Sequence, residues 1–232
     1  MSLPERVVCI LGMHRSGTSC LTGSLEQAGL FLAERHTWNP HNTKGNRENQ
    51  NFVDINDDVL SANGGAWDHP PRKVVWSAAQ LKRAEDLLAS YAGHEVFGFK
   101  DPRVLLVLDG WKRVCPGLRC VGVFRHPNAV AKSLEVRSEM PRDEALELWY
   151  RYNRILYRAH KKHAFPLLCF DVSEQEFKNE LAELIQHLGL GAGIQENTFY
   201  DEQLRTANLD TGQKLPWKVR RLYNNLVKRS LA

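Results

Sequence analysis

The sequence predicts an α/β fold with a central parallel sheet, on two observations. The first is a set of four short apolar runs of strand length, at residues 7–11, 96–99, 120–124 and 167–170, separated by stretches with helical periodicity. The second is a glycine-bounded turn at residues 12–19, which joins the first apolar run to a helical pattern. Strands that alternate with helices are typical of a parallel sheet covered by helices.

Seven helices are expected between and after these strands, at residues 17–29, 50–60, 77–92, 102–114, 128–137, 142–163 and 173–188. Ser77 and Ser173 are suitable N-caps, and Glu176 lies where a capping box needs it. Residues 30–49 are polar and contain Pro40 and Gly45, which predicts a long loop of the kind that often carries function.

Size and composition favour a single domain, residues 1–232, because 232 residues with 43% hydrophobic content suffice for one core and are few for two. The 31 basic and 27 acidic residues are spread along the chain, so the charge of +4 permits an anionic ligand but argues against nucleic-acid binding. Only residues 214–229 are locally basic.

The cysteine pattern and the apolar runs bear on the compartment. The five cysteines form no C-x-x-C pair, which indicates free thiols in a reducing compartment, so we expect a cytoplasmic protein. The longest apolar run near the N-terminus has only about seven residues, which is too short for a membrane span. Oligomeric state cannot be derived from the sequence.

The turn at residues 12–19 is a candidate phosphate cradle. A strand, a tight turn and a helix in this order direct backbone N–H groups and the positive end of a helix dipole at one small volume. A complete Walker A loop would have a lysine after its second glycine, where this chain has Thr18. The cation of the turn is Arg15, which precedes Gly17.

A second candidate phosphate site begins at Arg125, at the end of a predicted strand, and includes Ser133 two helical turns later. A guanidinium is a forked donor and a hydroxyl adds a further hydrogen bond to a phosphate. The alternative is that Arg125 only caps the strand and Ser133 faces solvent. Two phosphate sites in one domain indicate a nucleotide that is phosphorylated at two positions.

These two motifs resemble those of the sulfotransferases that use 3′-phosphoadenosine 5′-phosphosulfate (PAPS). Residues 15–19, Arg-Ser-Gly-Thr-Ser, match the family's loop for the 5′-phosphosulfate, and Arg125 with Ser133 match R-x-P-x-x-V-A-x-S, which binds the 3′-phosphate. Residues 44–49, 98–103, 170–171 and 187–190 are also similar to small, mostly bacterial members. The resemblance, which covers roughly residues 7–190, implies a three-layer sandwich with a central parallel sheet of the P-loop nucleotide-hydrolase type.

The resemblance also implies roles for individual residues. Arg15 would stabilise the leaving phosphate, while Ser16, Gly17, Thr18 and Ser19 would hold the 5′-phosphate and Arg125 and Ser133 the 3′-phosphate. No metal is expected, because a sulfuryl group carries less charge than a phosphoryl group. Glu48 is the first candidate for the base that deprotonates the acceptor, although a glutamate at a helix start also stabilises the helix dipole.

Several assignments stay open from the sequence. His14, His36, His41 and Asp101 are reserve candidates for the base. Lys100, Asp101 and Arg103 either bind ligand charge or form a structural ion-pair network. Trp38, Trp67 and Trp76 either stack on a sugar or adenine or cover the core. Residues 204–205 and 214–221 either close over the nucleotide or, in the second stretch, form a solvated amphipathic helix.

The function predicted on this basis is transfer of a sulfuryl group from PAPS to a hydroxyl of a carbohydrate or small-molecule acceptor, with release of adenosine 3′,5′-bisphosphate. An ATP-dependent small-molecule kinase, with Asp171 as a metal-binding carboxylate, is the alternative enzyme, and Thr18 in the place of the Walker lysine argues against it. A nucleotide-binding module without catalysis is the alternative of a different class.

Overall fold

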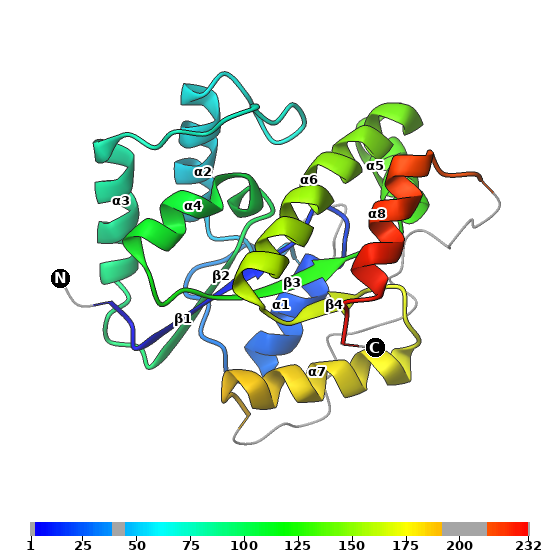
Figure 1. The fold of residues 1–232 in the computed structure, drawn as a ribbon. Coiled ribbons are helices and arrows are strands. Elements are labelled where there is room, and N and C mark those ends of the chain that lie inside the picture. The colour runs from blue at the N-terminus through cyan, green and yellow to red at the C-terminus, as the bar shows by residue number, and fades with distance from the viewer. Residues whose placement is uncertain (1–2, 39–44, 192–212, 232) are drawn as a thin grey trace. The chain divides into compact units, whose positions relative to one another are not determined.

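A four-stranded parallel sheet organises the chain. The computed structural model describes residues 3–38, 45–191 and 213–231 (Figure 1). Its strands are β1 (Arg6–Leu11), β2 (Val96–Lys100), β3 (Arg119–Phe124) and β4 (Leu167–Cys169), in the order β2-β1-β3-β4. Val8 pairs with Gly98 and Val123 with Leu168, both in parallel ladders. The α/β fold with a parallel sheet, predicted from the alternation of apolar runs and helices, is confirmed.

Eight helices are present in the described residues. They are α1 (Thr18–Gln27), α2 (Gln50–Ala62), α3 (Ala78–Ala89), α4 (Val104–Val114), α5 (Pro127–Ser138), α6 (Arg142–His163), α7 (Glu174–Leu188) and α8 (Trp217–Val227). The first seven coincide with the predicted helices to within a few residues, and α8 covers much of the basic stretch near the C-terminus. No helix in these ranges combines the length and the apolarity that crossing a bilayer requires.

The predicted helix caps are present. Ser77 accepts a hydrogen bond from the backbone N–H of Gln80, whose side chain accepts one from the backbone of Ser77 in return. Ser173 and Glu176 form the predicted capping box at the start of α7. These reciprocal bonds satisfy N–H groups that the first turn of a helix otherwise leaves without partners.

The chain divides into two compact units. Unit 1 comprises residues 1–11 and 30–121, and unit 2 comprises residues 12–29 and 122–232. The division passes through β3, between Val121 and Gly122. That the chain forms a single domain stays a prediction.

Aromatic side chains form the core of unit 1. The ring of Phe52 in α2 stacks on Phe99 of β2 and Trp111 of α4, with centroid distances of 4.3 and 5.1 Å. Trp76 is buried against Trp111, and its Nε1 donates to the carbonyl oxygen of Val107 at 3.2 Å. Trp76 is therefore part of this core, so the alternative in which it stacks on a ligand is wrong.

The core of unit 2 anchors the ends of its strands. Trp149 of α6 is fully buried, and its Nε1 donates to the carbonyl oxygen of Arg125 at 2.9 Å, directly after β3. Phe170, directly after β4, packs edge to face on Phe177 of α7, with centroids 5.8 Å apart. Buried aromatic side chains thereby fix the positions of the residues that follow β3 and β4.

Candidate functional site

The turn between β1 and α1 has an unusual backbone that its glycine permits. Gly17 has φ +89° and Arg15 has φ +66°, both in the left-handed region. A Cβ atom on Gly17 would lie 2.3 Å from the ring of Phe170. The turn therefore packs its backbone directly on an aromatic ring, a close approach that only glycine allows.

Hydrogen-bond donors gather at this turn. Ser16 is fully buried, and its hydroxyl has no hydrogen-bond partner within the described part of the chain. Helix α1 begins at the buried Thr18, and Ser19 is its second residue. The first turn of α1 contains no acidic side chain that would neutralise the positive end of the helix dipole. A buried hydroxyl without a partner is costly, and a ligand oxygen at this position would satisfy it.

Arg15 connects the two predicted phosphate motifs. Its Nε donates to the Oγ of Ser133 in α5 at 2.7 Å, across 118 positions of sequence. Ser133 is only 5% exposed, so the alternative in which it faces solvent is wrong. Burial, together with repulsion from Arg137 and Arg125, lowers the pKa of Arg15 to about 10. Arg15 remains protonated at neutral pH, and the repulsion indicates three positive charges near one another.

Arg125 is held at the end of β3 by an acidic partner. Its Nε lies 3.3 Å from Oδ1 of Asp171, and both side chains are about 95% buried. The guanidinium carbon also lies 5.5 Å from the centroid of the Phe170 ring. The backbone N–H of His126 donates to the same carboxylate. These contacts fix the guanidinium of Arg125 on the same aromatic ring that supports Gly17.

Arg137 is a candidate site residue that the sequence analysis missed. It is exposed and lies one helical turn after Ser133 on α5, so the two side chains share a face of the helix. Its charge is a larger contributor than that of Arg125 to the lowered pKa of Arg15. The spacing of four residues from Ser133 is the signal that could have identified it.

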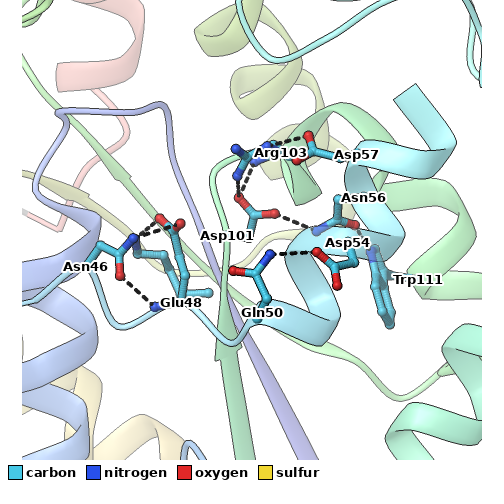
Figure 2. A network of polar contacts seen from close by, with 10 residues as sticks. Asn46, Glu48, Gln50, Asp54, Asn56, Asp57, Asp101, Arg103 and Trp111 are labelled. Atoms are coloured by element: carbon cyan, nitrogen blue, oxygen red, sulfur yellow. Dashed lines mark hydrogen bonds and ion pairs between the residues drawn. The ribbon is translucent and has the colours of Figure 1, made fainter. Parts of the chain in front are cut away.

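Glu48, the predicted base, belongs to unit 1 and is held by two donors (Figure 2). Lys100 Nζ donates to its Oε1 at 2.8 Å, and Asn46 Nδ2 donates to its Oε2 at 3.0 Å. Lys100 is 2% exposed, and the side chain of Glu48 is 12% exposed. An ion pair with this little exposure fixes the position of the carboxylate more firmly than a surface pair would.

Asp101 and Arg103 form the structural network that one alternative predicted (Figure 2). Asp101 is fully buried and accepts from Arg103 Nη1 at 2.9 Å and from Asn56 Nδ2 at 2.8 Å. Asn56 in turn accepts from Trp111 Nε1 at 2.8 Å. Burial raises the pKa of Asp101, against the opposing effect of Arg103. Through Asn56 and Trp111 this chain of contacts links α2 to α4.

The reserve candidate His14 lies within the turn at residues 12–19, directly before Arg15. The ring of His14 packs edge to face on Tyr152, with centroids 6.2 Å apart, and Trp38 is 68% exposed. His41, Lys44 and residues 204–205 lie outside the described residues. The described residues contain no group of three His, Cys, Asp or Glu side chains arranged to hold a metal ion.

The comparisons with known proteins give a match in fold. No family model matches the sequence, and no curated protein matches it. The structure is similar to the sulfotransferase domain of the olefin synthase of Synechococcus PCC 7002, with a TM-score of 0.61 and 16% identity over 98% of this chain and 96% of that one. The chain has the fold of sulfotransferase domains.

A second solved structure agrees with this assignment of the fold. Sulfotransferase STF1 of Mycobacterium tuberculosis H37Rv has a TM-score of 0.50 and 16% identity, over 97% of this chain and 77% of that one. Within this sulfotransferase fold, unit 2 brings together Arg15, Ser133 and Arg125 with the turn at residues 12–19. Unit 1 brings together Glu48 and Lys100.

Proposed function

We propose that the chain is a PAPS-dependent sulfotransferase, which moves a sulfuryl group to a hydroxyl of a carbohydrate or small-molecule acceptor and releases adenosine 3′,5′-bisphosphate. The observation that carries this proposal is the hydrogen bond from Arg15 Nε to Ser133 Oγ at 2.7 Å. It joins a turn suited to one phosphate to a helix suited to another. A nucleotide with phosphates at two positions fits such a pair of adjoining sites.

The side chains of unit 2 fit this ligand. The orphaned hydroxyl of Ser16 and the N-terminus of α1 would hold the 5′-phosphosulfate, since both offer donors without acidic competition. Arg125 and Ser133 would hold the 3′-phosphate. Arg137 would add a third cation, and a ligand with several negative charges would relieve the repulsion that lowers the pKa of Arg15.

The reaction requires little more than positioning and electrostatic stabilisation. The acceptor oxygen forms a bond to sulfur while the bond from sulfur to the 5′-phosphate oxygen breaks, and negative charge builds on that oxygen. Arg15 and the backbone N–H groups of residues 16–19 would stabilise this charge. Arg15 suits the task because its guanidinium keeps its proton well above neutral pH.

Glu48 stays the proposed base for the acceptor proton. The proton would pass from the acceptor hydroxyl to a carboxylate oxygen of Glu48, whose orientation Lys100 and Asn46 fix. A non-catalytic nucleotide-binding module would not need this arrangement. If the chain is an enzyme, replacement of Glu48 by glutamine should therefore reduce turnover. If the chain is a non-catalytic module, the same replacement should leave its nucleotide affinity unchanged.

The kinase alternative has less support. It needs Asp171 as a metal-binding carboxylate, whereas Asp171 is paired with Arg125 and accepts from the backbone of His126. A carboxylate already neutralised by a buried guanidinium is a poor ligand for Mg²⁺. Thr18 also stands where a Walker lysine would contact the terminal phosphates.

The test is formation of adenosine 3′,5′-bisphosphate from PAPS in the presence of a panel of sugars, phenols and small alcohols. We expect the wild-type chain to turn over with at least one acceptor and Arg15→Ala to be slower by about 10²–10³-fold. Lys132→Ala is the matched control, because it removes an exposed cation of α5 that pairs with Glu135. Turnover of Arg15→Ala at the wild-type rate, or phosphoryl transfer from ATP with Mg²⁺, would contradict the proposal.

A further inference from the structure

Positive charge is concentrated on two helical segments of unit 2. Residues 151–163, in the second half of α6, contain five Lys and Arg side chains and no acidic one. Residues 213–231, which include α8, contain six and no acidic one. The rest of the chain keeps 20 basic and 27 acidic residues, so it is net negative although the whole chain is +4.

The two segments form one surface, which we call the α6–α8 surface. Helices α6 and α8 pack against each other and lie side by side in Figure 1. Lys218 of α8 lies 5.1 Å from the ring centroid of Tyr150 in α6, and Arg229 lies 5.7 Å from that of Tyr157. Cations from one helix are thus held over aromatic rings of the other. The cations of the two segments are Arg151, which is half-buried, and the exposed Arg154, Arg158, Lys161, Lys162, Lys214, Lys218, Arg220, Arg221, Lys228 and Arg229. Lys218 is paired with Glu147 of α6 at 2.6 Å.

Large apolar side chains are exposed among these cations. Trp217 is 64% exposed, Val227 39% and Leu231 41%. The indole of Trp217 lies beside Arg221, with the guanidinium carbon 5.2 Å from the ring centroid. The buried side of α8 is formed by other residues, Val219, Leu222 and Leu226. The helix therefore has apolar side chains on both its inner and its outer sides.

We propose that the α6–α8 surface docks the protein on an anionic lipid membrane. The cations would contact the headgroups, and Trp217 would enter the interface, the depth that an amphipathic indole prefers. Clustered Lys and Arg side chains on an amphipathic helix are attracted by acidic lipids, which are abundant in cytoplasmic leaflets. Long basic side chains can keep their charge at the headgroups while their stems lie deeper.

The exposed aliphatic residues favour a membrane over other polyanions. A nucleic acid or an acidic polysaccharide is bound by cations and, for bases, by stacked aromatic rings. Neither needs exposed Val227 and Leu231 beside the charges. A bilayer can bind the cations and the exposed apolar side chains together, because the apolar side chains leave water while the cations stay at the headgroups. This inference does not depend on the proposed sulfuryl transfer.

The experiment is sedimentation of the full chain with two kinds of vesicle, phosphatidylcholine alone and phosphatidylcholine with about 30% phosphatidylserine. We expect binding to the second kind only, and binding that weakens as salt is raised. Arg220→Glu with Arg221→Glu should weaken it by at least about tenfold, and Trp217→Ala should weaken it without altering the salt dependence.

A matched variant separates this surface from general charge. Arg72→Glu with Lys73→Glu makes the same change in net charge, at two exposed cations of unit 1 that lie near the exposed Val75. It should bind the acidic vesicles as the wild type does. Equal losses in the two double variants would overturn the proposal, as would binding to heparin or DNA without binding to acidic vesicles. Circular dichroism of each variant verifies that it is folded.

Discussion

Gly17 meets two structural requirements at a single position. Its φ of +89° is one that side chains with a Cβ avoid, and the space that a Cβ would occupy is filled by the ring of Phe170, 2.3 Å away. Gly29, at the end of α1, has a φ of +99° but no atom within 4 Å of its Cβ position. The two glycines therefore share the backbone requirement, and only Gly17 adds the steric one.

This difference predicts unequal effects of alanine at the two positions. Gly17→Ala should lower the free energy of unfolding by about 3 kcal/mol, from the left-handed backbone together with overpacking against Phe170. Gly29→Ala should cost about 1 kcal/mol, from the backbone alone. Urea unfolding of both variants measures the difference. Equal losses would show that the turn does not pack on Phe170 as described.

Single residues also mark the limit of what sequence can predict here. The motifs predict Arg15 and Ser133 as phosphate ligands, but spacing along the chain contains no information on the 2.7 Å contact between them. Arg137 was missed because no motif names it. Trp76 looked like a loop residue, and its burial follows from the space left by Gly110, where a Cβ would lie 2.0 Å from the indole. Such contacts depend on tertiary packing.

Among the elements, α5 depends on a titratable cap. The imidazole Nδ1 of His126 accepts from the backbone N–H of Asn128 at 3.2 Å, and Pro127 occupies the first turn. Burial lowers the pKa of His126, partly offset by Asp171. The cap therefore stabilises the fold fully above the ordinary histidine pKa and is lost as pH falls through the lowered one, because protonated Nδ1 cannot accept.

Replacement of His126 by asparagine tests this dependence, since asparagine is also a good N-cap but does not titrate in this range. Between pH 7 and pH 5 the wild-type chain should lose about 1 kcal/mol more stability than His126→Asn. Thermal or urea unfolding at several pH values measures the slopes, and any constant difference between the two proteins is immaterial. Parallel slopes would contradict the role of His126 as a cap.

Elements were the most predictable level of this structure. The capping serines Ser77 and Ser173, the apolar runs and the helical periodicity are local signals, and each corresponds to an observed boundary within a few residues. Features that depend on contacts between distant residues were not predicted. Helix α4 has a non-helical residue inside it, Val107, at φ −118°, and its carbonyl oxygen instead accepts from the buried Trp76. The helical periodicity of the sequence contains no signal for this kink.

At the scale of the whole molecule, charge is distributed more unevenly than the composition indicates. The sequence shows residues 214–229 as basic, but α6 is less conspicuous because acidic Asp143, Glu144 and Glu147 precede its basic half. The two segments form one basic surface only because α8 packs on α6. The proposed phosphate-binding groups belong to the same unit as this surface, whereas Glu48 belongs to the other.

The central claim is that unit 2 binds a nucleotide through phosphates at both its 3′ and its 5′ position. Calorimetric titration with adenosine 3′,5′-bisphosphate, and separately with 5′-AMP and with ATP plus Mg²⁺, tests it most directly. We expect metal-independent binding of the bisphosphate and at least about tenfold weaker binding of 5′-AMP, because Ser133 and its neighbouring arginines lose their ligand. Equal affinity for the two nucleotides, or preference for ATP with Mg²⁺, would contradict the account.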